Sequence, residues 1–484
     1  MIGSIGTRNK KAIAVHSSLS AGTVRSSITV SRDLEKYFKH CTFFSSYDTE
    51  IVADNSILDI PVLSVVLPLA WVTGADVYVH ELDRTFAESI VALQREYEKM
   101  YLPFTTRLVA DKLVDNKYLS NNTALLFSGG LDCTYTLFSN MTLKPRLIMI
   151  LGTYDIPISN VTFLKAVEGE YSGFAEREGL TISFIRTNAL QILDRERVDH
   201  LFGSMCRTKS LDEGEYWPDD WPDYWTGIGY ALCHIGQSAP LSIRRFSQLL
   251  VAGGALLPID DEAKTRELRI REAQTRGKVQ FRDASNPTKE IAWANIRVKH
   301  DTSIRSRHEK ASLMKEFLNA HKVTLRVCLE CAHNRPPQSP PLKHLLNCSH
   351  CPKCSRTIAP LALAGIDPNE CGFCVDESTF DYIRASLPHH VRSDIAVWWK
   401  PLQRAIPEEI ETDRYGTRRF FEWLKSVDLE SIAKPDRNPL WNLYYRLPYP
   451  IAHASKIVWN RASKRSIISY FHHGIPCGRK RSCC

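Results

Sequence analysis

The chain has 484 residues, of which 44% are hydrophobic and 24% are charged. This composition is that of ordinary globular protein, so it excludes a globally disordered or fibrous chain. The length predicts roughly two to four folded units. The formal net charge of +8 suits an anionic ligand such as a nucleotide without requiring a nucleic acid.

Nothing in the sequence predicts a membrane protein. No stretch approaches the ~20 apolar residues that span a bilayer, and the first residues lack the apolar run of a secretory signal. We therefore expect a cytoplasmic protein with no membrane contact. The basic residues near the C-terminus are expected to form a solvated tail, and contact with a nucleic acid is the alternative. These residues are Arg461, Lys464, Arg465, Arg479, Lys480 and Arg481.

Changes in composition and in the pattern of hydrophobic residues divide the chain into four parts. Residues 1–120 read as an accessory α+β region with an amphipathic helix over 84–100. Residues 121–327 alternate apolar strands with helices, which predicts an α/β domain with a parallel sheet that binds its ligand at the carboxyl ends of the strands. Residues 328–378 are rich in cysteine, and 379–484 are expected to be mainly helical.

The α/β part contains the most distinct predicted elements. Because apolar runs alternate with amphipathic stretches, we expect strands at 124–127, 146–151 and 181–185, helices at 163–178 and 303–320, and a last strand at 323–327.

A glycine turn follows the first of these strands. It reads Ser128-Gly129-Gly130-Leu131-Asp132-Cys133-Thr134 and leads into a helix-like run. Two glycines let the backbone approach a ligand closely, and a helix start offers N–H groups to an anion. Hydroxyls at Ser128 and Thr134 can add donors, so a phosphate or pyrophosphate is the expected guest.

The loop resembles the SGGxDS signature of PP-loop ATP pyrophosphatases. In that class the loop holds the β- and γ-phosphates while a substrate oxygen attacks the α-phosphate. The final serine of the signature is replaced here by Cys133. A substituted phosphate loop is the favoured interpretation, and a nucleophilic thiolate at a helix N-terminus is the alternative.

Seven cysteines fall in one short window: Cys328, Cys331, Cys348, Cys351, Cys354, Cys371 and Cys374. Cys-x-x-Cys turns deliver pairs of thiolates to a tetrahedral metal, so the window predicts a bound Zn²⁺. By spacing alone, Cys328, Cys331, Cys348 and Cys351 make an acceptable zinc ribbon. An iron–sulfur cluster is a further alternative.

The combination of loop and cysteines resembles the 7-cyano-7-deazaguanine synthases, the QueC family. Those enzymes place one cysteine after a strand and then Cys-x-x-Cys-x-x-Cys around a zinc beside the phosphate loop. The resemblance implies Cys328, Cys348, Cys351 and Cys354 as the ligands. Cys331, Cys371 and Cys374 are then spare thiols or a second partial site.

The resemblance extends from about Thr123 to Phe373 and suggests further site residues. Gly152 follows the second strand, where PP-loop enzymes contact adenine through the backbone. Asp132, Arg307 and Lys310 are the candidate catalytic residues, with Asp132 as a contact for Mg²⁺ or substrate. His300 and Asp301 are additional candidates for binding a carboxylate or phosphates. For these two, as for Arg307 and Lys310, a salt bridge that stabilises the fold is the alternative.

The terminal additions and the length are similar to QatC, the QueC-like component of bacterial Qat anti-phage systems. This resemblance implies that the protein uses ATP to adenylate the carboxylate of a 7-deazaguanine derivative and transfers it to an amine, with release of AMP and pyrophosphate. The amine is expected on a partner protein from the same defence locus. The alternatives are a PP-loop enzyme that modifies RNA and a nucleotide-binding scaffold without turnover.

Overall fold

A computed structural model describes most of the chain. The described residues are 10–100, 103–153, 156–212, 224–253, 287–301, 305–334, 346–390, 395–410, 413–434 and 444–458. The basic residues expected to form a C-terminal tail lie outside them. Within the described residues, no helix has both the length and the apolar character that crossing a bilayer requires.

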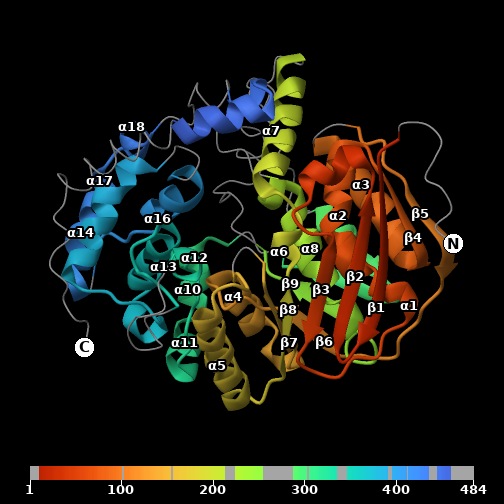
Figure 1. Ribbon diagram of the computed structural model, residues 1–484. Coiled ribbons are helices and arrows are strands. Elements are labelled where there is room, and N and C mark those ends of the chain that lie inside the picture. Colours follow the sequence, from red (N-terminus) through yellow and green to blue (C-terminus); the bar gives the residue numbers. More distant parts are fainter. Residues whose placement is uncertain are drawn as a thin grey trace.

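One large sheet organises the molecule (Figure 1). It has eleven strands in the order β10-β11-β9-β6-β7-β8-β3-β2-β1-β4-β5. The strands are β1 (Ala12–Ser20), β2 (Thr23–Val30), β3 (Thr42–Tyr47), β4 (Asp76–Asp83), β5 (Leu108–Val114), β6 (Thr123–Leu126), β7 (Arg146–Leu151), β8 (Ile182–Thr187), β9 (Gln248–Val251), β10 (Ala292–Trp293) and β11 (Ile296–His300).

The sheet has a parallel part and a mixed part. Strands β11, β9, β6, β7 and β8 are mutually parallel. Strand β3 then pairs antiparallel with β8 and joins the strands of the first 120 residues to the same sheet. The region expected to be accessory is therefore continuous with the α/β sheet.

Helices lie on both faces of the sheet, some of them packed against other helices. They are α1 (Asn55–Leu58), α2 (Ile60–Thr73), α3 (Arg84–Met100), α4 (Leu131–Ser139), α5 (Val161–Arg177), α6 (Ala189–Ile192), α7 (Arg195–Asp212), α8 (Tyr230–Gln237), α10 (Arg307–Leu313) and α11 (Lys315–His321). Side chains alternate across a strand, and β6 and β7 show the result. Ala124 and Ile148 belong to one core with α2 and α8, whereas Leu125 and Leu147 belong to a second core with α4 and α5.

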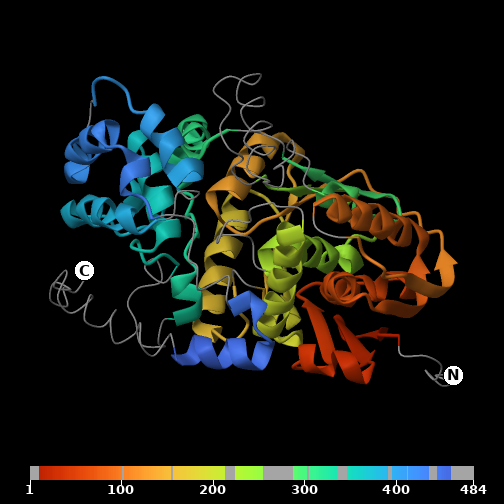
Figure 2. The ribbon, with the colours of Figure 1, turned by 90° about the horizontal axis from the view of Figure 1, so that it is seen from above.

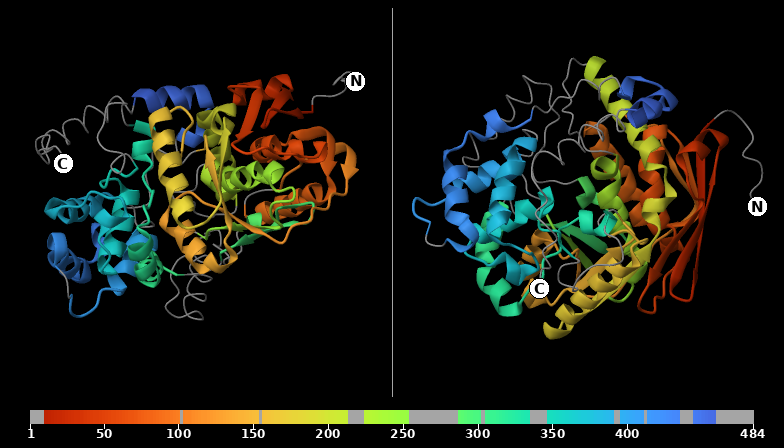
Figure 3. Two further views of the ribbon diagram at one scale, coloured as in Figure 1. Left: turned by 90° about the horizontal axis from the view of Figure 1, so that it is seen from below. Right: turned by 60° about the vertical axis from the view of Figure 1, so that its left-hand side comes forward.

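The remainder of the chain forms a helical group on one side of the sheet, away from the N-terminal strands (Figures 2 and 3). It contains α12 (Glu330–Asn334), α13 (Pro352–Leu363), α14 (Glu377–Ser386), the π-helical turn η9 (Ile395–Trp399), α16 (Lys400–Arg404), α17 (Thr417–Ser426) and α18 (Leu429–Ile432). A last helical segment, 444–458, returns to α7, where Lys456 pairs with Glu196 at 3.1 Å.

Two expected elements of the α/β part differ from the structure. The helix expected over 303–320 is broken at Met314 into α10 and α11. The segment 323–327 is not a strand, because its backbone bonds to the glycine turn and to the 3₁₀ helix Pro368–Cys371 rather than to the sheet. The N–H of Leu325 donates to the carbonyl of Cys371 at 3.0 Å, and that of Arg326 donates to the carbonyl of Gly129 at 2.7 Å.

Candidate functional site

The glycine turn lies where the strand order reverses. Strand β6 comes first in the chain among the five strands of the parallel part, and β7 and β8 lie on one side of it while β9 and β11 lie on the other. In such sheets ligands bind outside the carboxyl ends of the strands at this switch point. Residues 128–130 follow β6 and residues 252–253 follow β9, so both border the expected ligand position.

Two buried residues, Arg326 and Tyr171, hold the turn through hydrogen bonds to its carbonyl groups. Arg326 donates from its backbone N–H to the carbonyl of Gly129 at 2.7 Å and from Nε to the carbonyl of Ser128 at 2.8 Å. The hydroxyl of Tyr171 donates to the carbonyls of Gly129 at 3.4 Å and Thr324 at 3.1 Å. Because these contacts occupy the carbonyls, the turn has a fixed shape before any ligand arrives.

Gly129 is the position in the turn that requires glycine. Its φ is +78°, and an added Cβ would lie 1.9 Å from the Tyr171 hydroxyl. We expect Gly129→Ala to lower the free energy of unfolding by ~2 kcal/mol or more, from left-handed backbone strain and overpacking.

Gly130 provides the matched control, because a Cβ there would meet its nearest neighbour, Ser128 Oγ, at 3.6 Å. Gly130→Ala is expected to cost under ~1 kcal/mol. Urea unfolding of both variants checks the difference. Equal costs would contradict a special role for Gly129.

The start of helix α4 turns two polar side chains inward. Cys133 is 4% exposed and its thiol donates to the carbonyl of Gly130 at 3.2 Å. Thr134 is fully buried and its hydroxyl donates to the same carbonyl at 2.9 Å. Burial raises the pKa of the Cys133 thiol, so the thiol stays protonated near neutral pH. This disfavours the nucleophilic thiolate. The side chain of Leu131 is also buried. A ligand would therefore contact this residue through its backbone N–H.

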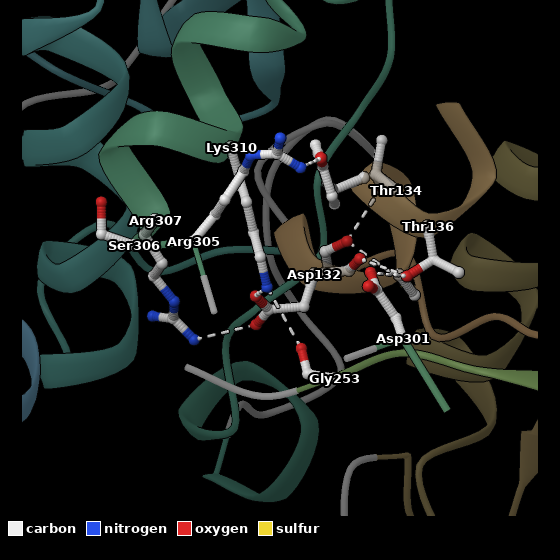
Figure 4. A network of polar contacts seen from close by, with 12 residues as sticks. Asp132, Thr134, Thr136, Gly253, Asp301, Arg305, Ser306, Arg307 and Lys310 are labelled. Atoms are coloured by element: carbon white, nitrogen blue, oxygen red, sulfur yellow. Dashed lines mark hydrogen bonds and ion pairs between the residues drawn. The ribbon is translucent and has the colours of Figure 1, made fainter. Parts of the chain in front are cut away.

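The three candidate catalytic residues come together beside the turn (Figure 4). Lys310 Nζ lies 2.7 Å from Asp132 Oδ1, and Arg307 Nη2 lies 3.5 Å from Asp132 Oδ2. Lys310 also donates to the carbonyl of Gly253 at 3.2 Å, which links the loops after β6 and β9. Both cations come from helix α10. They are three residues apart, so they lie on the same face of the helix.

The cations control the charge of Asp132. Burial alone would raise the pKa of its carboxyl group, but the charges of Arg307 and Lys310 outweigh burial and lower it. Asp132 is therefore a carboxylate throughout the neutral range. The Lys310 side chain is completely buried, so the pair is an anion and a cation held together within the protein.

The other two polar candidates have structural partners. Asp301 follows β11 and accepts from the hydroxyl of Thr136 on α4 at 2.9 Å. His300 is buried against the hydroxyl of Thr288 at 3.1 Å, and burial lowers its pKa. His300 is thus a neutral imidazole near neutral pH.

Gly152 occupies a crowded position after β7. Its φ is +106°, and an added Cβ would lie 1.6 Å from the carbonyl oxygen of Thr187. The next residue, Thr153, is fully buried and its hydroxyl lies 3.0 Å from Nε2 of His234 on α8. Sequence reasoning missed His234, because nothing in its own neighbourhood marks it as adjacent to a strand end far away in the chain.

Four cysteine sulfurs form a compact group. Cys328, Cys348, Cys351 and Cys354 place their Sγ atoms within 4.8 Å of one another, and such a cluster can hold a metal ion such as zinc. The separations of 3.8 Å for Cys328–Cys351 and 3.9 Å for Cys348–Cys354 are close to the ~3.8 Å that a tetrahedron with Zn–S of about 2.3 Å requires.

Backbone groups support the thiolates. The N–H of Cys351 donates to Cys348 Sγ at 3.2 Å, and that of Cys331 donates to Cys328 Sγ at 3.2 Å. The grouped set is the one implied by the resemblance and not the set from spacing alone, which would replace Cys354 with Cys331. Cys371 lies outside the group, and burial raises its pKa to about 12.

The segment 324–328 connects the cysteine cluster to the glycine turn. Arg326 holds the turn, and Cys328 is two residues further along. Asn347, beside Cys348, fixes this segment. Its Oδ1 accepts from the N–H of Val327 at 3.0 Å, and its Nδ2 donates to the carbonyl of Leu325 at 2.6 Å. An ordered cluster therefore helps to position the group that clamps the turn.

Comparison of the chain with protein-family models, with curated proteins and with solved structures found no match in any of the three.

Proposed function

We propose that the protein is a QueC-like, PP-loop enzyme that uses ATP to adenylate a carboxylate and then transfers the acyl group to an amine. The acid is a 7-deazaguanine derivative, and the amine belongs to a partner protein of the same anti-phage defence locus. The enzyme acts in the cytoplasm with ATP and Mg²⁺ and carries a structural Zn²⁺. This proposal combines the resemblance of the motifs with the contacts described above.

The observation that carries the proposal is the group Asp132, Lys310 and Arg307 beside a glycine turn at the switch point in the parallel part of the sheet. Backbone N–H groups at a glycine turn suit phosphate oxygens. Two cations beside one carboxylate leave an excess of positive charge, which favours a strongly anionic ligand.

The first chemical step is an attack of a carboxylate oxygen on the α-phosphorus of ATP. An O–P bond forms, the bond from the α-phosphorus to the bridging oxygen breaks, and pyrophosphate leaves with that electron pair. The turn at Ser128, Gly129 and Gly130 would hold the departing phosphates, while Lys310 and Arg307 would neutralise charge that develops during transfer. Asp132 would hold Mg²⁺, which when bound shields the phosphates.

The second step releases AMP. The amine forms a C–N bond with the acyl carbon, the bond between that carbon and the AMP oxygen breaks, and the amine loses a proton. Holding acid and nucleotide in one orientation supplies much of the rate. The cluster of Cys328, Cys348, Cys351 and Cys354 would hold the Zn²⁺ with a structural role, since four thiolates leave no open position for substrate.

The proposal is tested by exchange of labelled pyrophosphate into ATP, with 7-carboxy-7-deazaguanine as the acid. Exchange needs no acceptor amine, so the partner protein is not required. We expect exchange that depends on the acid, and AMP rather than ADP as the product when hydroxylamine is added as an amine. Formation of ADP and phosphate would contradict it.

Two other outcomes identify the alternatives. Formation of AMP that depends on RNA and falls steeply with salt would indicate a nucleic-acid substrate. Tight ATP binding without exchange in the presence of the acid and of the neighbouring gene products would indicate a scaffold.

A further inference from the structure

Arg307 has a second contact besides Asp132. Its guanidinium carbon lies 4.3 Å from the centroid of the Trp398 ring, and that of Arg356 lies 4.8 Å from the same centroid. Three separate elements meet here, because Arg307 is on α10, Arg356 on α13 and Trp398 on η9. Each stacked cation gains about 0.5–2 kcal/mol. Two like charges on one indole also repel each other, so stacking alone gives no reason for the pair.

Arg307 keeps two donors without acceptors. Its side chain is 11% exposed, and only Nη2 faces Asp132. Nε and Nη1 are buried and have no hydrogen-bond partner among the residues that the structure describes. Leaving a buried donor unsatisfied costs about 1–3 kcal/mol, and more for a charged group. The hydroxyl of Ser355, the residue before Arg356, is also buried and has no partner within the described part of the chain.

The charges around Arg307 also favour an anionic ligand. Asp132 carries one negative charge and already pairs with two cations, Lys310 and Arg307. Arg356 brings a further positive charge to the ring that Arg307 contacts. A ligand with anionic oxygens would satisfy the two donors of Arg307, because guanidinium groups bind carboxylates and phosphates in this way.

We propose that Arg307, Arg356 and Trp398 form a second oxyanion site next to the glycine turn, and that it takes the carboxylate of the acid. The identity of the ligand as substrate acid rests on the function proposed above, whereas the existence of the anion site does not. Arg307 touches both Asp132 and Trp398, so it joins this site to the phosphate side.

The origin of the residues favours the acid over the nucleotide. The phosphate side is built from loops that follow β6 and β9, the strands of the switch point. Arg356 and Trp398 come from α13 and η9, outside the sheet. Because α13 and η9 lie outside the sheet, they can bind the second substrate without changing the phosphate site. The helical group thereby helps to select the acid.

Arg356→Met is the test variant, because methionine keeps an apolar side chain against the indole and removes the charge. The matched control is Arg384→Met. Arg384 is exposed and stacks on Trp423 at 4.9 Å in the same helical group. The probes are 7-carboxy-7-deazaguanine and the Mg²⁺ complex of α,β-methylene-ATP, and binding is measured by calorimetry without turnover.

We expect Arg356→Met to weaken binding of the acid at least ~10-fold, the loss of one charged hydrogen bond, and to leave nucleotide binding within about twofold. Arg384→Met is expected to change neither. If Arg356→Met weakens nucleotide binding instead, the site still binds an oxyanion, and that oxyanion is a phosphate of ATP. Acid and nucleotide binding that match those of Arg384→Met would overturn the proposal.

The experiment separates this proposal from the proposed reaction. Binding of the acid that depends on Arg356, together with no pyrophosphate exchange, would refute the reaction and retain the anion site. Absence of acid binding by the unmodified protein, with nucleotide binding that ignores Arg356, would refute the anion site.

Discussion

Asp132→Asn is expected to lower AMP formation at least ~100-fold, the effect typical of removing one preorganised electrostatic contact from an active site. The same change leaves Lys310 as a completely buried cation without its carboxylate. Breaking such a pair from one side costs about 3–5 kcal/mol. Activity is measured by AMP formation and stability by urea unfolding.

A double-variant cycle separates the loss of the pair from the loss of the carboxylate. Lys310→Met removes the buried cation, so the double variant Asp132→Asn/Lys310→Met is expected to be more stable than the sum of the single losses implies. Activity stays low in the double variant. Strict additivity would show that the two residues are not coupled, contrary to their 2.7 Å contact.

The control is the exposed pair of Lys322 and Glu370, whose nitrogen and oxygen lie 3.2 Å apart with side chains 67% and 58% exposed. Lys322→Met is expected to change stability by under ~1 kcal/mol and to leave AMP formation unchanged. If Lys322→Met lost as much stability as Lys310→Met, burial would not explain the effect at Lys310.

The shifted pKa of Asp132 also gives a direction for pH dependence. Its folded-state pKa is lowered, so the carboxylate stabilises the fold above its unfolded pKa of about 3.9. That contribution is lost as the pH falls through the lower folded value. Titration of Asp132 is thus expected to leave activity flat near neutral pH.

Cys354→Ala is expected to abolish metal binding and to lower stability by several kcal/mol. Cys354 is fully buried among the four grouped sulfurs, and structural zinc contributes directly to folding free energy, on the order of 10 kcal/mol in small zinc domains. The metal content is measured by mass spectrometry of the purified protein, and stability is measured with and without a chelator. We expect one Zn²⁺ per chain before the change.

Cys371→Ala is the matched control, because Cys371 is equally buried in the same region but lies outside the group. It is expected to keep its zinc and to lose stability when a chelator is added, whereas Cys354→Ala is expected to be insensitive to chelator. Zinc bound equally by both variants would refute the ligand set. The Cys331→Ala variant is also expected to keep its zinc. The ligand set from spacing alone contains Cys331, so that set predicts the loss of zinc in this variant.

Loss of zinc also has an expected effect at the turn. Cys328 follows the segment that carries Arg326, and Arg326 holds the carbonyls of Ser128 and Gly129. Disorder of the cluster would release that clamp, so Cys354→Ala is expected to weaken ATP binding although it is not a phosphate contact.

The spacing of apolar residues was sufficient to predict the helices and strands in which this spacing is regular. The helix expected over 84–100 and the strand expected over 146–151 have these bounds in α3 and β7, because apolar spacing marks both. Gly129 was singled out because a glycine turn lets the backbone approach a ligand, whereas Gly152 was implied by the resemblance to PP-loop enzymes. In the structure both adopt positive φ at a close approach of another chain segment.

Long-range pairing could not be predicted in this way. The continuity of the sheet depends on β3 pairing with β8, which lies far along the chain, and no local pattern encodes that contact. The same is true of His234 beside Thr153 and of Arg356 beside Trp398. Segment 323–327 is rich in β-branched residues like a strand, but its backbone bonds to Gly129 and Cys371 instead.

The cysteines illustrate the limit of spacing. The four Cys-x-x-Cys spacings of the window are compatible with more than one set of four ligands, and the fold decides between Cys331 and Cys354. Cys354 lies in the first turn of α13, which directs it to the other three sulfurs.

The most direct test of the proposed chemistry follows the oxygen of the acid. 7-Carboxy-7-deazaguanine labelled with ¹⁸O in its carboxylate is incubated with the protein, ATP, Mg²⁺ and hydroxylamine, and AMP is analysed by mass spectrometry. If the carboxylate attacks the α-phosphorus, one ¹⁸O is expected in each AMP released. AMP without ¹⁸O, or ADP in its place, would contradict the account.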